Sequence, residues 1–335
     1  MERAGRLGYA ERGELYVIGS RGLDTYRIWS YYVTGKPEDV KSVFLTQAAD
    51  ARTQVLRTLA ALQRGADSGV DAELPISFLE SSFGAFQQRQ VNPAWNWGRD
   101  NILATLQELL RHHLVEIFDS DRYRLTDLGR LASEGGVFVD SIIRLVAVLR
   151  SVSTALNSTT LVAAAQVTRE LDDVHMPFAK KAKNTEHRRW PHELAYQQVA
   201  PQVQSMLGID GSDHLAGPVR AKKAMACLLY ASGTPLSDIE RHLMQHQLGD
   251  GAAGSVRALA DRTRDLIPAV ARVFAFLHPD VAIGDIAERT MARLELGLIF
   301  GVALTRAQYL RLFERGIMAP ERFEARGLTA STPTP

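Results

Sequence analysis

Residues 97–126, WGRDNILATLQELLRHHLVEIFDSDRYRLT, carry a helix pattern that is followed at once by two short β patterns. Leucines and one isoleucine recur at the three- and four-residue spacing of a single helix face. Behind them, the runs 115–118 and 123–126 are β-type segments joined by the polar turn 119–121. Two further helix patterns, at 55–62 and 78–86, precede this stretch. Helices with a hairpin directly behind them predict a winged helix over residues 51–136.

The chain on either side of the predicted winged helix has a different character. Residues 1–50 resemble a fragment of an α/β domain, with a strand at 14–19 and a helix at 24–33. One strand cannot make a sheet, so its apolar residues need neighbouring strands that this sequence does not contain, or they form an exposed edge that favours aggregation. Residues 137–300 predict a helical bundle, followed by a terminal helical element at 301–327 and a Ser/Thr/Pro tail at 328–335 that we expect to be disordered. The predicted fold class is therefore mainly α.

Composition excludes several classes of protein. The chain has 335 residues, of which 46% are hydrophobic and 23% charged, so it can bury a sizeable core. A net charge of +1 means that any nucleic-acid site must come from local clustering of basic residues. Cys227 is the only cysteine, which excludes an intrachain disulfide and fits a reducing compartment. No apolar run reaches the roughly 18 residues of a membrane span, so we expect a cytoplasmic protein with no membrane partner.

The first nineteen residues, MERAGRLGYAERGELYVIG, place two arginines and a glycine directly before the predicted strand. Guanidinium groups bind phosphate oxygens in a bidentate way, and glycines let the backbone approach a phosphate. The R-A-G-R-x-G cluster resembles the last characteristic motif of superfamily 2 helicases. By this resemblance Arg3 and Arg6 are candidate catalytic residues, acting in trans as phosphate contacts or as an arginine finger. The alternative is a solvated terminus that does not use them.

The resemblance extends over most of the chain in short pieces. A motor-domain ending, a winged helix, a helical bundle and a small terminal helical element occur in the same order in the Ski-like helicases of superfamily 2, including the archaeal repair helicases. The pieces that carry the resemblance are GKPEDVKS at 35–42, YRLTDLGR at 123–130 and residues 220–277. They imply the carboxyl-terminal portion of such a helicase, beginning inside the last motor motif, with residues 1–50 as the remnant of its second RecA-like motor domain.

The motifs of a complete motor are missing from the sequence. It contains no G-x-x-x-x-G-K-[ST] phosphate loop and no D-E-x-H or D-E-A-D. The Walker lysine and the magnesium-binding carboxylate supply most of the electrostatic stabilisation in such motors, so we do not expect a self-sufficient ATPase. The resemblance implies a separate or lost chain that carries the motor. That chain would bring ATP and magnesium, and no cofactor is expected in this one.

Residues 255–277 predict a long helix that is the best candidate for contact with nucleic acid. Its candidate residues are Arg257, Arg264 and Arg272. Their offsets of 0, 7 and 15 place them near one helix face. By position, this helix resembles the one that tracks single-stranded nucleic acid in the family, and arginine both pairs with phosphates and stacks on bases. The alternative is a solvated face whose arginines pair with Asp261 and Asp265.

A second basic cluster spans residues 180–190. Its candidate nucleic-acid-binding residues are Lys180, Lys181, Lys183, Arg188, Arg189 and Trp190. Basic side chains beside an aromatic ring could neutralise phosphates and stack on a base, and the alternative is a charged loop between helices. The third helix of the predicted winged helix offers few groups for reading base edges: Arg99, Arg111, His112 and His113. For that module the resemblance implies a role in packing and as a hinge.

The leading hypothesis is a nucleic-acid-binding helicase portion that grips single-stranded DNA or RNA while a motor on another chain translocates. One alternative is a non-catalytic protein-interaction module with a structural winged helix. Another is a winged-helix transcription regulator, which the weakly basic third helix disfavours. We predict no metal site, because His242 and His246 lack both the glutamate of H-E-x-x-H and a third ligand.

Overall fold

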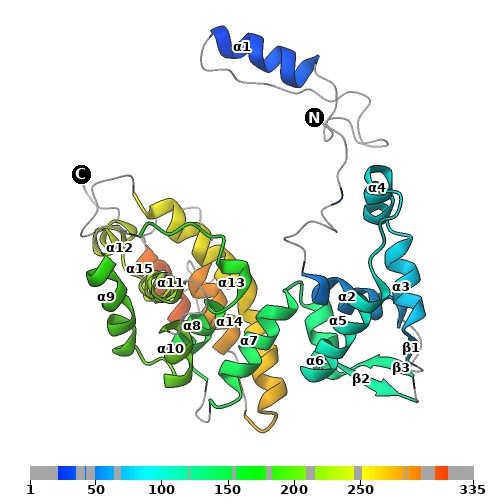
Figure 1. Ribbon diagram of the computed structural model, residues 1–335. Coiled ribbons are helices and arrows are strands. Elements are labelled where there is room, and N and C mark those ends of the chain that lie inside the picture. Colours follow the sequence, from blue (N-terminus) through cyan, green and yellow to red (C-terminus); the bar gives the residue numbers. More distant parts are fainter. Residues whose placement is uncertain are drawn as a thin grey trace.

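The computed structural model describes residues 22–34, 42, 50–63, 69–119, 121–152, 156–178, 183–208, 216–244, 251–281, 283, 286–295 and 306–315. Helices make up most of these residues, so the predicted mainly α fold is confirmed. A smaller unit containing the three strands lies beside a larger helical bundle, and one helix stands apart from both (Figure 1). The predicted strand at 14–19 and the tail at 328–335 lie outside the described residues, as does most of the terminal element at 301–327.

The smaller unit combines helices with a three-stranded antiparallel sheet. Its elements are α2 (Ala51–Leu62), β1 (Val70–Asp71), α3 (Glu73–Glu80), α4 (Phe83–Val91), α5 (Arg99–Arg111), β2 (Val115–Phe118), β3 (Arg122–Leu125) and α6 (Asp127–Glu134). The strand order is β1-β3-β2, and Tyr123 of β3 pairs with both Val70 and Ile117. α6 approaches the sheet so closely that a Cβ on Gly129 would lie 1.8 Å from the Leu114 carbonyl oxygen. Only glycine fits at this contact.

One predicted helix of this unit is two helices in the structure. The pattern at 78–86 is interrupted at Ser81 and Ser82, where α3 ends and α4 begins. The Ser82 hydroxyl accepts a hydrogen bond from the Ala85 amide and so caps α4. Serine favours an N-cap because its side chain satisfies an amide that has no partner within the helix.

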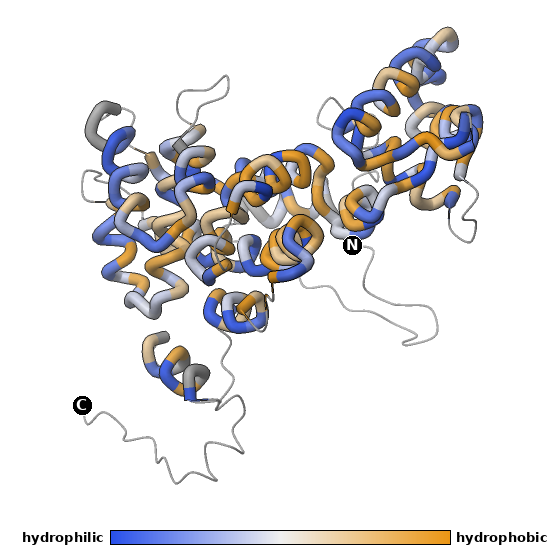
Figure 2. Tube along the Cα trace, turned by 90° about the horizontal axis from the view of Figure 1, so that it is seen from below, coloured by the Kyte–Doolittle hydropathy of each residue, from blue (hydrophilic) through white to orange (hydrophobic). Residues whose placement is uncertain are grey.

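The bundle follows from residue 139 onward. Its elements are α7 (Val139–Leu149), α8 (Ser158–Ala165), a 3₁₀ turn (Arg169–Leu171), α9 (Lys183–Ala195), α10 (Pro201–Gly208), α11 (Ala216–Ala231), α12 (Leu236–Leu243), α13 (Ala253–Leu277), α14 (Ile286–Leu294) and α15 (Arg306–Glu314). α13 packs against α7, α8, α11 and α14, and its carboxyl-terminal half also contacts α6 of the smaller unit. α8 is buried from Thr160 to Ala165. Hydrophobic residues lie mostly where the helices of the bundle face one another (Figure 2).

The apolar spacing over residues 192–207 predicts a single helix, which the structure divides between two helices. α9 begins at Lys183 and therefore contains most of the basic cluster, and a turn at 196–200 separates it from α10. α10 starts at Pro201, and proline suits the first position of a helix because its missing N–H would have no partner there. Because Pro201 has no N–H, a single helix running through residue 201 would lose a backbone hydrogen bond.

The helix that stands apart is α1 (Gly22–Ile28), which continues into a π-helical turn (Trp29–Val33). The helix predicted at 24–33 is therefore confirmed and begins two residues earlier. In Figure 1 it lies well away from the rest of the chain. None of the helices described by the structure is long and apolar enough to cross a membrane.

Candidate nucleic-acid interface

The long helix α13 has one buried side and one exposed side. Its 25 residues bury Val256, Leu259, Thr263, Ile267, Val270 and Phe274, which recur at helical spacing. The opposite side carries the three candidate arginines together with two aspartates and Pro268. Pro268 lies inside the helix on this exposed side, where water can bond the carbonyl that loses its amide partner.

The three candidate arginines share a face, as predicted, but they differ in their surroundings. Arg257 is exposed and has no hydrogen bond or ion pair with any residue that the structure describes. The Arg272 side chain is 57% exposed and lies 3.9 Å from the carboxylate of Glu134 on α6. At this distance and exposure the attraction is weak. Arg257 and Arg272 are therefore available to bind a phosphate.

Arg264 is already occupied by acidic partners. It donates two hydrogen bonds to the Asp265 carboxylate, at 3.1 and 3.0 Å. Its other terminal nitrogen lies 3.8 Å from both Asp261 and Glu295. The hydrogen bond with Asp265 holds the pKa of Arg264 above its usual range. The alternative reading of this face, in which arginines pair with neighbouring aspartates, therefore describes Arg264 but neither of the other two.

An aromatic side chain on the same face was missed at the sequence level. Phe276 is 44% exposed and lies one turn beyond Arg272. The i, i+4 spacing from Arg272 is the signal that could have found it, because such residues neighbour one another on a helix. An exposed ring next to an arginine is a combination that can stack on a base and hold the adjacent phosphate.

The basic cluster at 180–190 is split by the structure. Lys180 and Lys181 lie outside the described residues, and of Lys183 only the backbone, in the first turn of α9, is described. Arg188 is exposed and has no partner among the described residues. Arg188 is thus the one member of this cluster with a described, accessible and unpaired side chain.

The prediction that Trp190 stacks on a base is corrected by its burial. Its side chain is 0% exposed and lies among α9, α11 and α12. The guanidinium of Arg189 lies 4.2 Å from the Trp190 ring, donates to Glu193 at 2.5 Å and donates to the His242 carbonyl at 3.1 Å. The helix spacing of a charged cluster cannot show which of its residues face inward. Both residues serve the packing of α9 here.

Glu193 joins Arg189 to His242 in a small polar group. The Glu193 carboxylate lies 2.8 Å from His242 Nε2. Burial raises the pKa of Glu193, but hydrogen bonds from Arg189 and His242 outweigh burial and hold it below the usual range. His246 lies outside the described residues, and the part of the chain that the structure describes contains no cluster of three or more potential metal ligands.

Two buried lysines on α11 were not identified from the sequence. Lys222 is 0% exposed, pairs with the equally buried Glu186 at 3.1 Å and donates to the Pro177 carbonyl. Lys223 is 2% exposed and donates to the carbonyls of Leu171 and Asp172. Burial lowers the pKa of Lys223 to about 8. Lysines inside an otherwise apolar helix pattern are the only signal that a sequence could give for this arrangement.

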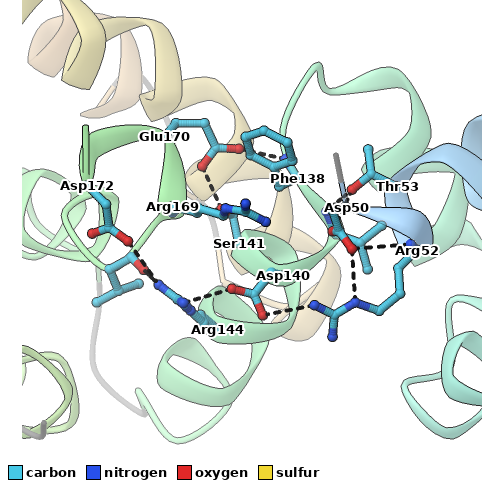
Figure 3. A network of polar contacts seen from close by, with 12 residues as sticks. Asp50, Arg52, Thr53, Phe138, Asp140, Ser141, Arg144, Arg169, Glu170 and Asp172 are labelled. Carbon is cyan, nitrogen blue, oxygen red and sulfur yellow. Dashed lines mark hydrogen bonds and ion pairs between the residues drawn. The ribbon is translucent and has the colours of Figure 1, made fainter. Parts of the chain in front are cut away.

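The junction between the smaller unit and the bundle lies at the amino-terminal end of α7 (Figure 3). The amides of Phe138 and Val139 are among those that an α-helix leaves without a partner. Glu170 accepts from the Phe138 amide at 2.6 Å, and the Thr53 hydroxyl on α2 accepts from the Val139 amide at 2.9 Å. Thr53 in turn donates to Asp50 at 2.8 Å. Two distant segments thus complete one helix end and fix the units to each other.

Charged side chains surround this junction in an alternating row (Figure 3). Asp140 lies 3.6 Å from Arg52 and 2.8 Å from Arg144. Arg144 also lies 3.6 Å from Asp172, to which Arg220 donates two hydrogen bonds. Each of these three arginines is thus held by carboxylates and is not available to a ligand.

The remaining sequence candidates lie away from α13 or outside the description. Arg99 forms an ion pair with Glu73, while Arg111, His112 and His113 are exposed at the end of α5. Arg3 and Arg6 lie outside the described residues, so the structure does not place them. No protein-family model matches the chain, and no curated protein matches its sequence.

Proposed function

We propose that the chain is a nucleic-acid-binding portion of a superfamily 2 helicase and that it grips a single strand along the exposed side of α13. The observation that carries this proposal is the pair of arginines, Arg257 and Arg272, with Phe276 on the same side of the longest described helix. Phosphates bind unpaired arginines, and bases stack on exposed rings. Arg188 on α9 is a further phosphate contact.

The smaller unit supports the proposal by its topology. We assign residues 51–136 to a winged helix, because α2, β1, α3 with α4, and α5 precede a β2–β3 hairpin, and β1 pairs with β3. In this assignment the winged helix packs against the bundle and fixes its orientation, because charged residues of the two units pair with one another at the junction. Residues 1–50 are assigned to the remnant of an α/β motor domain on the sequence resemblance alone.

The proposal places ATP and magnesium on another chain. Arg3 and Arg6 would contact the phosphates of that chain, and the bundle would hold the strand while the motor moves. Whether the strand is DNA or RNA is decided by comparing oligonucleotides of the same sequence, because only RNA presents a 2′-hydroxyl.

Salt-dependent binding tests the proposal. Fluorescence anisotropy with a labelled single-stranded oligonucleotide gives the slope of log affinity against log salt, which is about 0.7 for each phosphate contact on a single strand. We expect Arg257→Ala with Arg272→Ala to reduce the slope by about 1.4 and to weaken binding. Arg241→Ala on α12 is the matched control, because Arg241 is 76% exposed and pairs with Asp238 of its own helix and with no other residue that the structure describes. Equal effects of the double variant and the control would exclude α13 as the binding face.

A protein-interaction module is the second candidate, and a specific observation favours it. Phe78, Phe83 and Phe86 on α3 and α4 are each about half exposed, as is Trp29 beside α1. A soluble monomer seldom leaves so many large apolar side chains in contact with water. Absence of oligonucleotide binding at low salt would favour this candidate over the first.

A further inference from the structure

α1 and its π-helical turn carry three exposed aromatic side chains and pack against no other helix or strand that the structure describes. Tyr26 is 75% exposed, Trp29 58% and Tyr31 75%, and Figure 1 shows the segment clear of both units. Gly22–Ile28 and Trp29–Val33 together span 12 residues. Isolated helices shorter than about 12 to 15 residues are marginal in water, because nucleation is costly and packing normally provides their stability. The segment therefore requires an apolar surface.

α3 and α4 offer such a surface. Leu74 and Phe78 lie one turn apart on the exposed side of α3, at 52% and 47% exposure. Phe83 and Phe86 on α4 are 52% and 55% exposed, and their rings stack with centroids 6.3 Å apart. In Figure 1 α4 stands at the end of the column that α3 begins, away from α2 and α5.

The charges near this surface are already neutralised. Glu73 of α3 is paired with Arg99 on α5. Glu80 is paired with Arg89 and also accepts from the Trp97 amide at 2.6 Å. The uncharged rings of Trp29 and Tyr31 can therefore cover the α3–α4 side without burying an unpaired charge.

A hydrogen bond places Ser42 next to α4. The Ser42 amide donates to Gln87 Oε1 at 2.7 Å, and Gln87 lies one turn from Phe83 on the same helix. Seven residues lie between Thr34 and Ser42, and the eight Cα-to-Cα steps of this stretch reach about 29 Å at most when extended. A tether of this length keeps the segment near its own α3–α4 surface, at an effective concentration on the order of millimolar.

We propose that residues 22–33 dock in cis on the exposed side of α3 and α4, with Trp29 and the two tyrosines against Phe78, Phe83 and Phe86. A second copy of the chain carries the same pair of surfaces, but at micromolar protein concentration the tethered segment outcompetes it. The docked segment covers the three exposed phenylalanines of α3 and α4. The inference is independent of the nucleic-acid proposal, since none of these residues lies on α13.

Hydrogen–deuterium exchange followed by mass spectrometry tests the docking. We expect the amides of residues 25–33 to exchange about tenfold more slowly in the natural chain than in a Phe83→Ser, Phe86→Ser double variant. Ile117→Ser is the matched control, because Ile117 is a similarly exposed apolar residue (59%) on β2. Exchange in α5 reports whether each variant keeps its fold.

Four outcomes decide the proposal. Docking in cis is supported if the double variant removes the protection and the control retains it. The protection must also be the same at low and high protein concentration. Protection that grows with protein concentration assigns the surface to a second copy and overturns the proposal, as does rapid exchange in the natural chain. The reciprocal variant Trp29→Ser, Tyr31→Ser must accelerate exchange in α4; unchanged exchange there also overturns it.

Discussion

The junction at the amino-terminal end of α7 and the exposed side of α13 use the same residue type for different purposes. At the junction, Arg144 lies between two carboxylates, and Arg220 holds one of them with two hydrogen bonds. On α13, Arg257 has no partner among the described residues and Arg272 has a distant one. Helix spacing places arginines on one face in both regions. The regions differ in whether carboxylates from other segments lie beside those arginines. Paired arginines hold this structure together, and unpaired ones remain for a ligand.

The comparison predicts a large effect when a junction carboxylate is removed. Glu170→Ala leaves the Phe138 amide and the buried Ser141 hydroxyl without their acceptor. Hydrogen bonds to a charged group contribute about 1.5–3 kcal/mol each, so we expect the free energy of unfolding to fall by about 3 kcal/mol. Urea denaturation measures this change.

The carboxylate of Glu134, which lies on α6 next to α13, is the control for this prediction. The Glu134 side chain is 66% exposed and lies 3.9 Å from Arg272. We expect Glu134→Ala to change stability by less than about 0.5 kcal/mol. If both variants lost a similar free energy of unfolding, the carboxylates at the junction would not contribute more to stability than those beside α13.

A buried lysine gives a smaller effect that depends on pH. Lys223 donates to two carbonyls and has a pKa lowered to about 8 by burial, from 10.5. The unfolded chain therefore binds more protons than the folded chain between these values, and stability rises as pH increases through this window. We expect a gain of about 2 kcal/mol between about pH 8 and pH 10 from this residue.

Comparison with Lys223→Met isolates that contribution. The variant lacks the ionisable group but retains a flexible apolar chain of similar length, so the rise with pH should be smaller by that amount. Thermal unfolding at a series of pH values measures the difference. A parallel pH dependence in both proteins would contradict a lowered pKa at Lys223.

The sequence predicted the elements whose signals are local. Apolar spacing located α5 and α13, and the polar turn at 119–121 located the β2–β3 hairpin. The strand β1, only two residues long, gave no pattern and is defined by its pairing with β3. The division between α9 and α10 does not follow from apolar spacing, which continues across it; Pro201, suited to the first position of a helix, is its local signal.

The candidate site could be predicted only in part, because the partners of charged residues come from distant segments. Spacing placed the three arginines of α13 on one side, but Glu295 and Glu134 come from elsewhere in the chain. Trp190 was predicted on the surface because its neighbours are basic. Its burial depends on contacts with α11 and α12 that no local pattern contains.

The smallest predicted effect concerns Arg264, and it separates the two kinds of arginine within one helix. Because three carboxylates already surround its guanidinium, Arg264→Ala should weaken oligonucleotide binding by less than about twofold, whereas Arg257→Ala removes a phosphate contact.

Asp265→Asn removes the carboxylate that holds Arg264 most closely. In that variant the salt slope should steepen by up to about 0.7, the value of one added contact on a single strand. Anisotropy titrations at several salt concentrations measure both changes. If Arg264→Ala and Arg257→Ala weakened binding equally, the pairing in the free protein would not govern which arginines the strand uses, and the carboxylates would have to move aside on binding.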